Sequence, residues 1–158
     1  MTDQSQTMRQ ELIERNHIRD LVHGYCWAVD TGTLEEVMAL FDDECDLLLI
    51  PGSKRAGRAA VERWYNRYMS HRLECLRHLI HNQIITLDGD QATSQSYFDA
   101  VGGLQGESIV VGGFYEDTLR KVDAEWKFTE KIIQVDFMVP LSEGWGGEKI
   151  KTKPWWYD

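Results

Sequence analysis

Asp30 is the first residue whose position points to chemistry. It continues the helical stripe of Val22 and Cys26, which predicts a carboxylate that faces inward. The negative end of a helix dipole and an apolar environment both raise the pKa of such a carboxylate unless a cation or donor compensates, as is useful in a general base. From position alone, capping of the turn at residues 31–33 is the slightly favoured alternative.

His81 is the second candidate. Side chains alternate between the two faces of a strand, so one face is predicted to hold Leu79, His81, Gln83, Ile85 and Leu87. This places an imidazole among apolar neighbours, where a histidine is more often a hydrogen-bonded core residue than a catalyst. His78 would face the other way, so the two rings should not converge on one metal ion. The other histidines, His17, His23 and His71, are expected to be solvated.

Seven further residues are candidates for the wall of a substrate pocket: Tyr25, Trp64, Tyr68, Tyr97, Asp99, Tyr115 and Phe137. Tyrosine hydroxyls could donate to a developing oxyanion, although an aromatic residue on a sheet is core packing by default. Aromatic residues make up 11% of the chain, which favours a pocket for an apolar, aromatic substrate. No cofactor and no metal site are expected, because no set of ligands converges at suitable spacing.

Hydrophobic periodicity predicts the elements of the first half. A helix is expected over residues 11–29, and Thr33 with Glu36 forms a capping box that starts a second helix reaching Phe41. A short strand is expected over residues 47–50 and a third helix over residues 59–69. Cys26, Cys45 and Cys75 are widely spaced and lack a CxxC pattern, which favours buried thiols.

The second half is rich in β-branched and aromatic residues separated by turn signals. Antiparallel strands are expected over residues 79–87, 92–101, 107–121 and 126–139. Helices followed by a meandering sheet predict an α+β fold in which about three N-terminal helices pack on one face of a curved, mainly antiparallel sheet. The tail, residues 141–158, ends in Trp155, Trp156 and Tyr157 and is expected to fold over the sheet or onto a neighbouring subunit.

Length and charge set the broad class. The 158 residues predict one domain, residues 1–158. A formal charge of -9 without a Lys/Arg run argues against nucleic acid and membrane surfaces as partners. The polar N-terminus lacks the regions of a signal peptide, so a cytoplasmic protein is expected. A curved open sheet leaves an apolar outer face, which predicts a homodimer or homotrimer.

Four segments resemble the SnoaL-like family of the nuclear-transport-factor-2-like (NTF2-like) superfamily, which has a cystatin-like fold. They are IRDLVHGYCWAVDTGTLEEVMALFDDE (18–44), RHLIHNQI (77–84), ESIVVGGFYEDTLRKVDAEWKF (107–128) and KIIQVDFMVP (131–140). The resemblance implies a cone-shaped pocket faced by an Asp that ends the first helix and a His that opens the first long strand. Asp30 and His81 match these two positions. Similar families include scytalone dehydratases, dehydrochlorinases, NTF2-like aromatic lyases and, more distantly, ketosteroid isomerase.

The resemblance implies a cofactor-independent lyase in which Asp30 orients His81 for proton removal from a small hydrophobic compound. Elimination of water or halide, or a retro-aldol carbon–carbon cleavage, would follow. The alternatives are an isomerase or polyketide-type cyclase, a non-catalytic small subunit of a ring-hydroxylating dioxygenase, and a ligand-binding module. Dehydrochlorinases carry a Lys where this chain has Tyr25, and scytalone dehydratases carry a Tyr where it has Val29, so neither substrate can be carried over.

Overall fold

The computed structural model describes residues 3–144 and 146, so most of the predicted tail, including Trp155, Trp156 and Tyr157, lies outside the described residues. Helices come first and the sheet follows, in the order α1 (Asp3–Thr31), α2 (Leu34–Ala39), β1 (Phe41–Ile50), β2 (Lys54–Ala56), α3 (Arg58–Ser70), β3 (Glu74–Asp88), β4 (Gln91–Leu104), β5 (Glu107–Val122) and β6 (Glu125–Pro140). The predicted α+β fold is confirmed. None of the described helices combines the length and apolarity that crossing a membrane requires.

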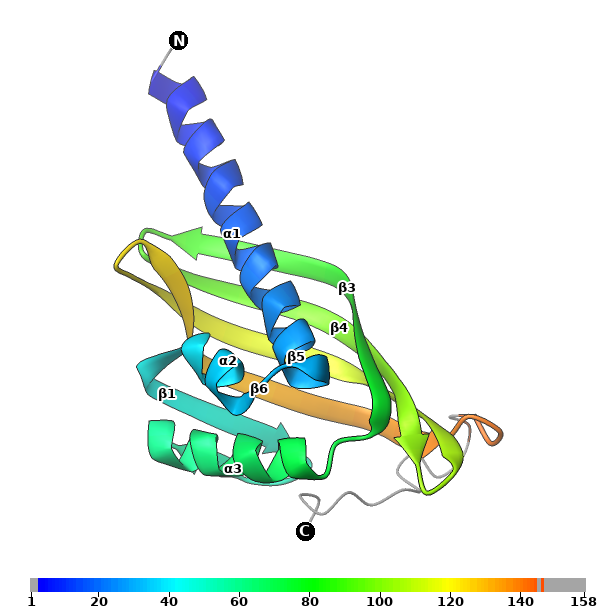
Figure 1. Ribbon diagram of the computed structural model, residues 1–158. Helices are drawn as coiled ribbons and strands as arrows, with labels where there is room; N and C mark the ends of the chain where they lie inside the picture. The colour runs from blue at the N-terminus through cyan, green and yellow to red at the C-terminus, as the bar shows by residue number, and fades with distance from the viewer. Residues whose placement is uncertain (1–2, 145, 147–158) are drawn as a thin grey trace.

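The protein has one curved sheet of six strands, in the order β2-β1-β6-β5-β4-β3. Every neighbouring pair is antiparallel except β1 with β6, which run parallel. The helices lie on one face of the sheet, here called the inner face, and the long helix α1 crosses it (Figure 1). The strands β4, β5 and β6 agree closely with their predicted ranges, but β3 begins at Glu74 rather than at residue 79, so it includes His78. The three-residue strand β2 was not predicted.

The stripe predicted on α1 forms the centre of the core. Ile18, Val22, Cys26 and Val29 are all buried against the inner face of the sheet. Tyr25 joins them, and its ring makes edge contacts with Tyr115 at 5.9 Å and Phe128 at 5.7 Å. Full burial of a side chain of this size contributes about 1.5–3 kcal/mol, so this packing fixes where α1 ends over the sheet.

The first long strand, β3, carries a bulge that exchanges its two faces. Its register against β4 shifts between His81 and Ile84, and Asn82 has a φ of 52°, a conformation that asparagine adopts more readily than most residues. Before the bulge the inward residues are Leu76, His78 and Ile80, and after it they are Gln83, Ile85 and Leu87. The prediction that His81 shares the face of Ile85 is therefore wrong, because strict alternation does not hold across a bulge.

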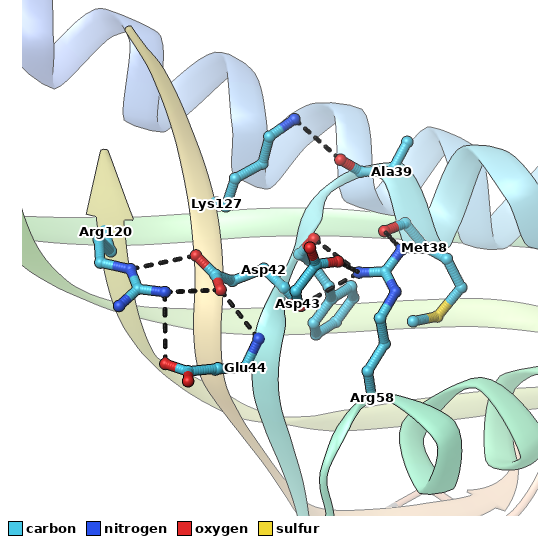
Figure 2. Close-up of polar contacts among 9 residues, drawn as sticks. Met38, Ala39, Asp42, Asp43, Glu44, Arg58, Arg120 and Lys127 are labelled. Carbon is cyan, nitrogen blue, oxygen red and sulfur yellow. Dashed lines mark hydrogen bonds and ion pairs between the residues drawn. The ribbon is translucent and has the colours of Figure 1, made fainter. Parts of the chain in front are cut away.

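Two arginines hold the junction between α2 and β1 (Figure 2). Arg58 donates to the Met38 carbonyl, an acceptor that the end of α2 leaves open, and to the carbonyls of Phe41 and Asp42 at the start of β1. Arg120 forms a bidentate pair with the Asp42 carboxylate, at 3.1 and 2.7 Å. The strand β1 begins at Phe41, before the predicted residue 47, where Phe41 pairs with Phe128 of β6, so Phe41 lies in the strand rather than in the second helix.

The three cysteines differ in their environments. Cys26 and Cys45 are buried thiols, as predicted, and burial raises the pKa of Cys26 to about 12 and of Cys45 to about 11. Cys75 is exposed, because Leu76 beside it takes the inward position on β3. The prediction of a third buried thiol is wrong.

Glu14 is a buried carboxylate near the middle of α1. It accepts hydrogen bonds from Lys121 Nζ at 2.7 Å and from Trp126 Nε1 at 2.8 Å. The Lys121 bond is the main cause that lowers the pKa of Glu14 from 4.5 to about 2, against the opposing effect of burial. A carboxylate with a depressed pKa in the folded state stabilises the protein above its unfolded pKa and loses that contribution as the pH falls toward its folded pKa.

Glu14→Gln is therefore expected to lower the free energy of unfolding by about 1–2 kcal/mol at pH 7, after allowance for solvent screening. Between pH 4.5 and about 2 the difference from wild type should shrink, because the wild type itself becomes protonated there. Urea unfolding across this range measures it, with the exposed Glu11→Gln as control. A constant difference at every pH would contradict the assigned ionic role.

Candidate active site

Asp30 lies at the C-terminal end of α1 and binds His78 on β3. Its Oδ1 is 2.5 Å from His78 Nδ1, and its Oδ2 accepts the His78 backbone N–H at 2.8 Å. The two side chains are only 10% and 8% exposed. Because the carboxylate is bound to His78, capping of the turn at residues 31–33 is not its role in this structure.

The bulge in β3 explains why His78, and not His81, is the partner of Asp30. His81 points to the outer face, where its Nε2 lies 3.3 Å from Asp99 Oδ2 and both side chains are about half exposed. The predicted pairing of Asp30 with His81 is therefore wrong in the identity of the histidine. The sequence signal that could have located the bulge is Asn82, a residue type that tolerates a positive φ within a strand.

His78 opens into a cavity of about 410 Å³ between α1, α3 and the inner face of the sheet. Most of its wall is apolar or aromatic: Tyr25, Val29, Leu49, Trp64, Tyr68, Leu73, Leu76, Phe98, Ala100, Leu104, Val111, Tyr115, Ile133, Val135 and Met138. The remaining lining residues are His71, Arg72 and His78. This size is at the lower end of the range for small-molecule sites and leaves room for a compound with one or two rings.

Four of the seven residues predicted for the pocket wall line this cavity, namely Tyr25, Trp64, Tyr68 and Tyr115. Tyr97 and Asp99 do not, because the inward residues of β4 at this level are Ser96, Phe98 and Ala100.

Phe137 also lies away from the cavity. The register of β6 against β5 shifts between Gly113 and Gly112, so that Val135 and Met138 face the cavity and Phe137 does not. The Phe137 ring occupies the space above Gly112, where any Cβ would overlap it.

Arg72 is a lining residue that the sequence did not single out. It follows α3, and its Nη1 donates to Val29 O at 3.2 Å and to Gly32 O at 3.4 Å. These two carbonyls lie at the end of α1, one residue before and two residues after Asp30. Burial raises the pKa of the Tyr68 hydroxyl, the negative charge of Asp30 raises it further, and the positive charge of Arg72 lowers it. Arg72 therefore helps to hold the end of α1, and its charge, like that of Asp30, acts on the pKa of the Tyr68 hydroxyl.

A buried ion pair lies behind the cavity wall. Lys131 Nζ is 2.8 Å from Asp117 Oδ1, and neither side chain is exposed to solvent. The ammonium also lies 4.1 Å from the ring centroid of Tyr25 and 3.9 Å from that of Tyr115. Burial raises the pKa of Asp117, although Lys131 acts in the opposite direction. The Lys131 ammonium therefore packs against the rings of Tyr25 and Tyr115, which line the cavity on their other side.

The described part of the chain brings no three His, Cys, Asp or Glu side chains together in an arrangement that could hold a metal ion. Of these residue types, His71 and His78 line the cavity and Asp30 lies behind His78, while the rest of the wall is aromatic or aliphatic except for Arg72. What this arrangement can do by itself is move a proton at the imidazole.

Residues 10–131 match the family model of the SnoaL-like domain. The chain belongs to this family. A search of curated proteins finds no significant match to the SnoaL-like chain.

Solved structures similar to this SnoaL-like domain share its cystatin-like, NTF2-like fold. A candidate scytalone dehydratase from Novosphingobium aromaticivorans is 24% identical, with a TM-score of 0.77 and coverage of 84% of this chain and 91% of that one. A candidate aromatic ring hydroxylase from the same organism is 23% identical, with a TM-score of 0.73 and coverage of 84% and 96%. The type 3 hexachlorocyclohexane dehydrochlorinase from Novosphingobium barchaimii is 18% identical, with a TM-score of 0.73 and coverage of 91% and 97%.

Proposed function

We propose that this SnoaL-like protein is a lyase that uses His78, oriented by Asp30, as a general base on a small hydrophobic, aromatic compound. The observation that carries the proposal is the Asp30–His78 pair, held at 2.5 Å with the imidazole at the wall of an apolar cavity. A dehydratase and a dehydrochlorinase among the proteins of the same fold support it.

In a neutral imidazole, the contact with Asp30 sets the tautomer. An ionised carboxylate can only accept hydrogen bonds, so His78 Nδ1 carries the proton and Nε2 carries the lone pair. Since Nδ1 is occupied by Asp30, Nε2 is the nitrogen that a substrate in the cavity can reach. Removal of a substrate proton by Nε2 produces an imidazolium, which the Asp30 carboxylate stabilises.

Elimination follows when the substrate carries a leaving group next to the carbon that loses its proton. The electrons of the broken C–H bond form a double bond as hydroxide or halide departs, and the imidazolium can return its proton to a departing oxygen. In the retro-aldol variant, Nε2 removes the proton of a hydroxyl group, whose oxygen forms a carbonyl as the carbon–carbon bond breaks. The leaving carbon takes the electron pair, and the imidazolium returns the proton to it. The water-poor wall strengthens the electrostatic contact between imidazolium and carboxylate.

Two-ring β-hydroxy and β-chloro ketones provide a direct test, because a base that removes the proton beside their carbonyl triggers loss of water or HCl. The wild type in D2O is expected to release water or chloride, detected by mass spectrometry and chloride titration. Deuterium incorporation without loss of a leaving group would instead identify an isomerase or cyclase. Ketones that bind but neither eliminate nor exchange protons would contradict a general-base enzyme and favour a binding module.

A further inference from the structure

The charge of the cavity wall is concentrated in one residue. Among the described residues that line the cavity, Arg72 is the one with a permanent charge, and no Asp, Glu or Lys accompanies it. The chain as a whole has a formal charge of -9, so a cation in this wall is contrary to the overall balance. An arginine in a largely apolar cavity favours a ligand group of opposite charge.

Arg72 retains donors for such a group. In the described part of the chain its hydrogen bonds are both made by Nη1, to Val29 O and Gly32 O, and it forms no ion pair with a carboxylate there. A guanidinium has five N–H groups in a rigid fork, so Nη2 and Nε can still bind a partner. Because Nη1 anchors the side chain, binding there costs little additional side-chain entropy.

We propose that Arg72 binds an anionic oxygen of the substrate, so that the substrate class is an aromatic compound with a carboxylate or phenolate group. The inference rests on the proposed function because it assumes that the substrate occupies the same cavity. Arg72 and His78 both line that cavity, so a substrate held by its anionic oxygen at Arg72 presents its ring to the apolar wall and its reactive carbon to His78. A hydrogen bond to an ionic group is worth about 1.5–3 kcal/mol, or about 10- to 100-fold in affinity.

Equilibrium binding of 2-naphthoate and 2-naphthamide, which differ mainly in charge, tests the proposal without any turnover. The wild type is expected to bind naphthoate at least about 10-fold more tightly than naphthamide, as measured by ligand fluorescence at pH 8. Arg72→Gln should abolish this preference while leaving the affinity for naphthamide within about twofold, since a glutamine amide can still donate to the end of α1. Arg72→Lys should retain part of the preference.

The matched control is Arg77→Gln, which removes the same charge from an exposed position one residue before His78. It is expected to leave both affinities unchanged. A wild type without preference for naphthoate, or an Arg72→Gln variant that keeps the preference, would overturn the proposal. Equal losses for both ligands in Arg72→Gln would also overturn it, because Arg72 would then only maintain the shape of the site. Failure of the lyase proposal would appear separately, as bound ketones that undergo no reaction.

Discussion

His78→Ala is expected to lower kcat/KM for elimination by about 10²- to 10⁴-fold, the usual contribution of a positioned general base. The loss should appear in kcat, because the imidazole acts in the transition state of proton transfer and does not contribute to binding of the substrate ring. His81→Ala is the matched control on the same strand. It removes an outward imidazole just before the bulge and should change kcat/KM by less than about twofold.

Asp30→Asn should produce a loss of similar size, because an amide can donate to His78 Nδ1 and so favours the wrong tautomer. Residues that act as one unit are strongly non-additive, so the double variant with His78→Ala should be about as slow as His78→Ala alone. Circular dichroism and urea unfolding check that the fold is retained. Full activity in either single variant, or a large loss in His81→Ala, would rule out Asp30 and His78 as the catalytic pair.

Lys131→Met is expected to have the largest effect on stability, about 3–5 kcal/mol in the free energy of unfolding. It removes the only described cation beside the buried carboxylate of Asp117 and leaves that charge without a counter-ion in the core. Adding Asp117→Val should restore most of the lost stability, because replacement of a buried ion pair by apolar side chains is often neutral or stabilising. Urea unfolding of the single and double variants measures both effects.

The corresponding control is Lys121→Met, which breaks the pair with Glu14. That pair is partly exposed, with Lys121 at 21%, so its loss should cost less than the loss of Lys131. Equal losses in the two single variants, or a double variant no more stable than Lys131→Met, would show that the pair of Lys131 with Asp117 is not held as ions in the core.

The outer face of β3 and β4 carries exposed apolar residues. Leu79, Ile84, Tyr97 and Val101 remain between 39% and 65% exposed in the isolated chain. Association into a homodimer or homotrimer and the cytoplasmic location stay predictions.

Local sequence determined most of the helices and strands of this protein and the direction of the Asp30 side chain toward the sheet. The stripe of α1, the capping box at Thr33 and the strands β4 to β6 depend on neighbours within a few residues and were predicted closely. The starts of α1 and β3 were predicted too late, at residues 11 and 79 rather than at Asp3 and Glu74. The inward direction of Asp30 followed from the same periodicity, because Val22, Cys26 and Asp30 lie four residues apart on one helix.

Tertiary structure alone decided which side chains meet Asp30. A single extra residue in β3 shifts every later side chain to the other face, so the choice between His78 and His81 depends on how β3 pairs with β4 rather than on spacing in the chain. The same applies to Phe137, displaced by the shift in β6, and to Lys131 and Arg72, whose partners are distant in sequence. Hydrophobic periodicity can be read from the sequence of a single strand. Register depends on how two strands pair, so it is decided only in the folded sheet.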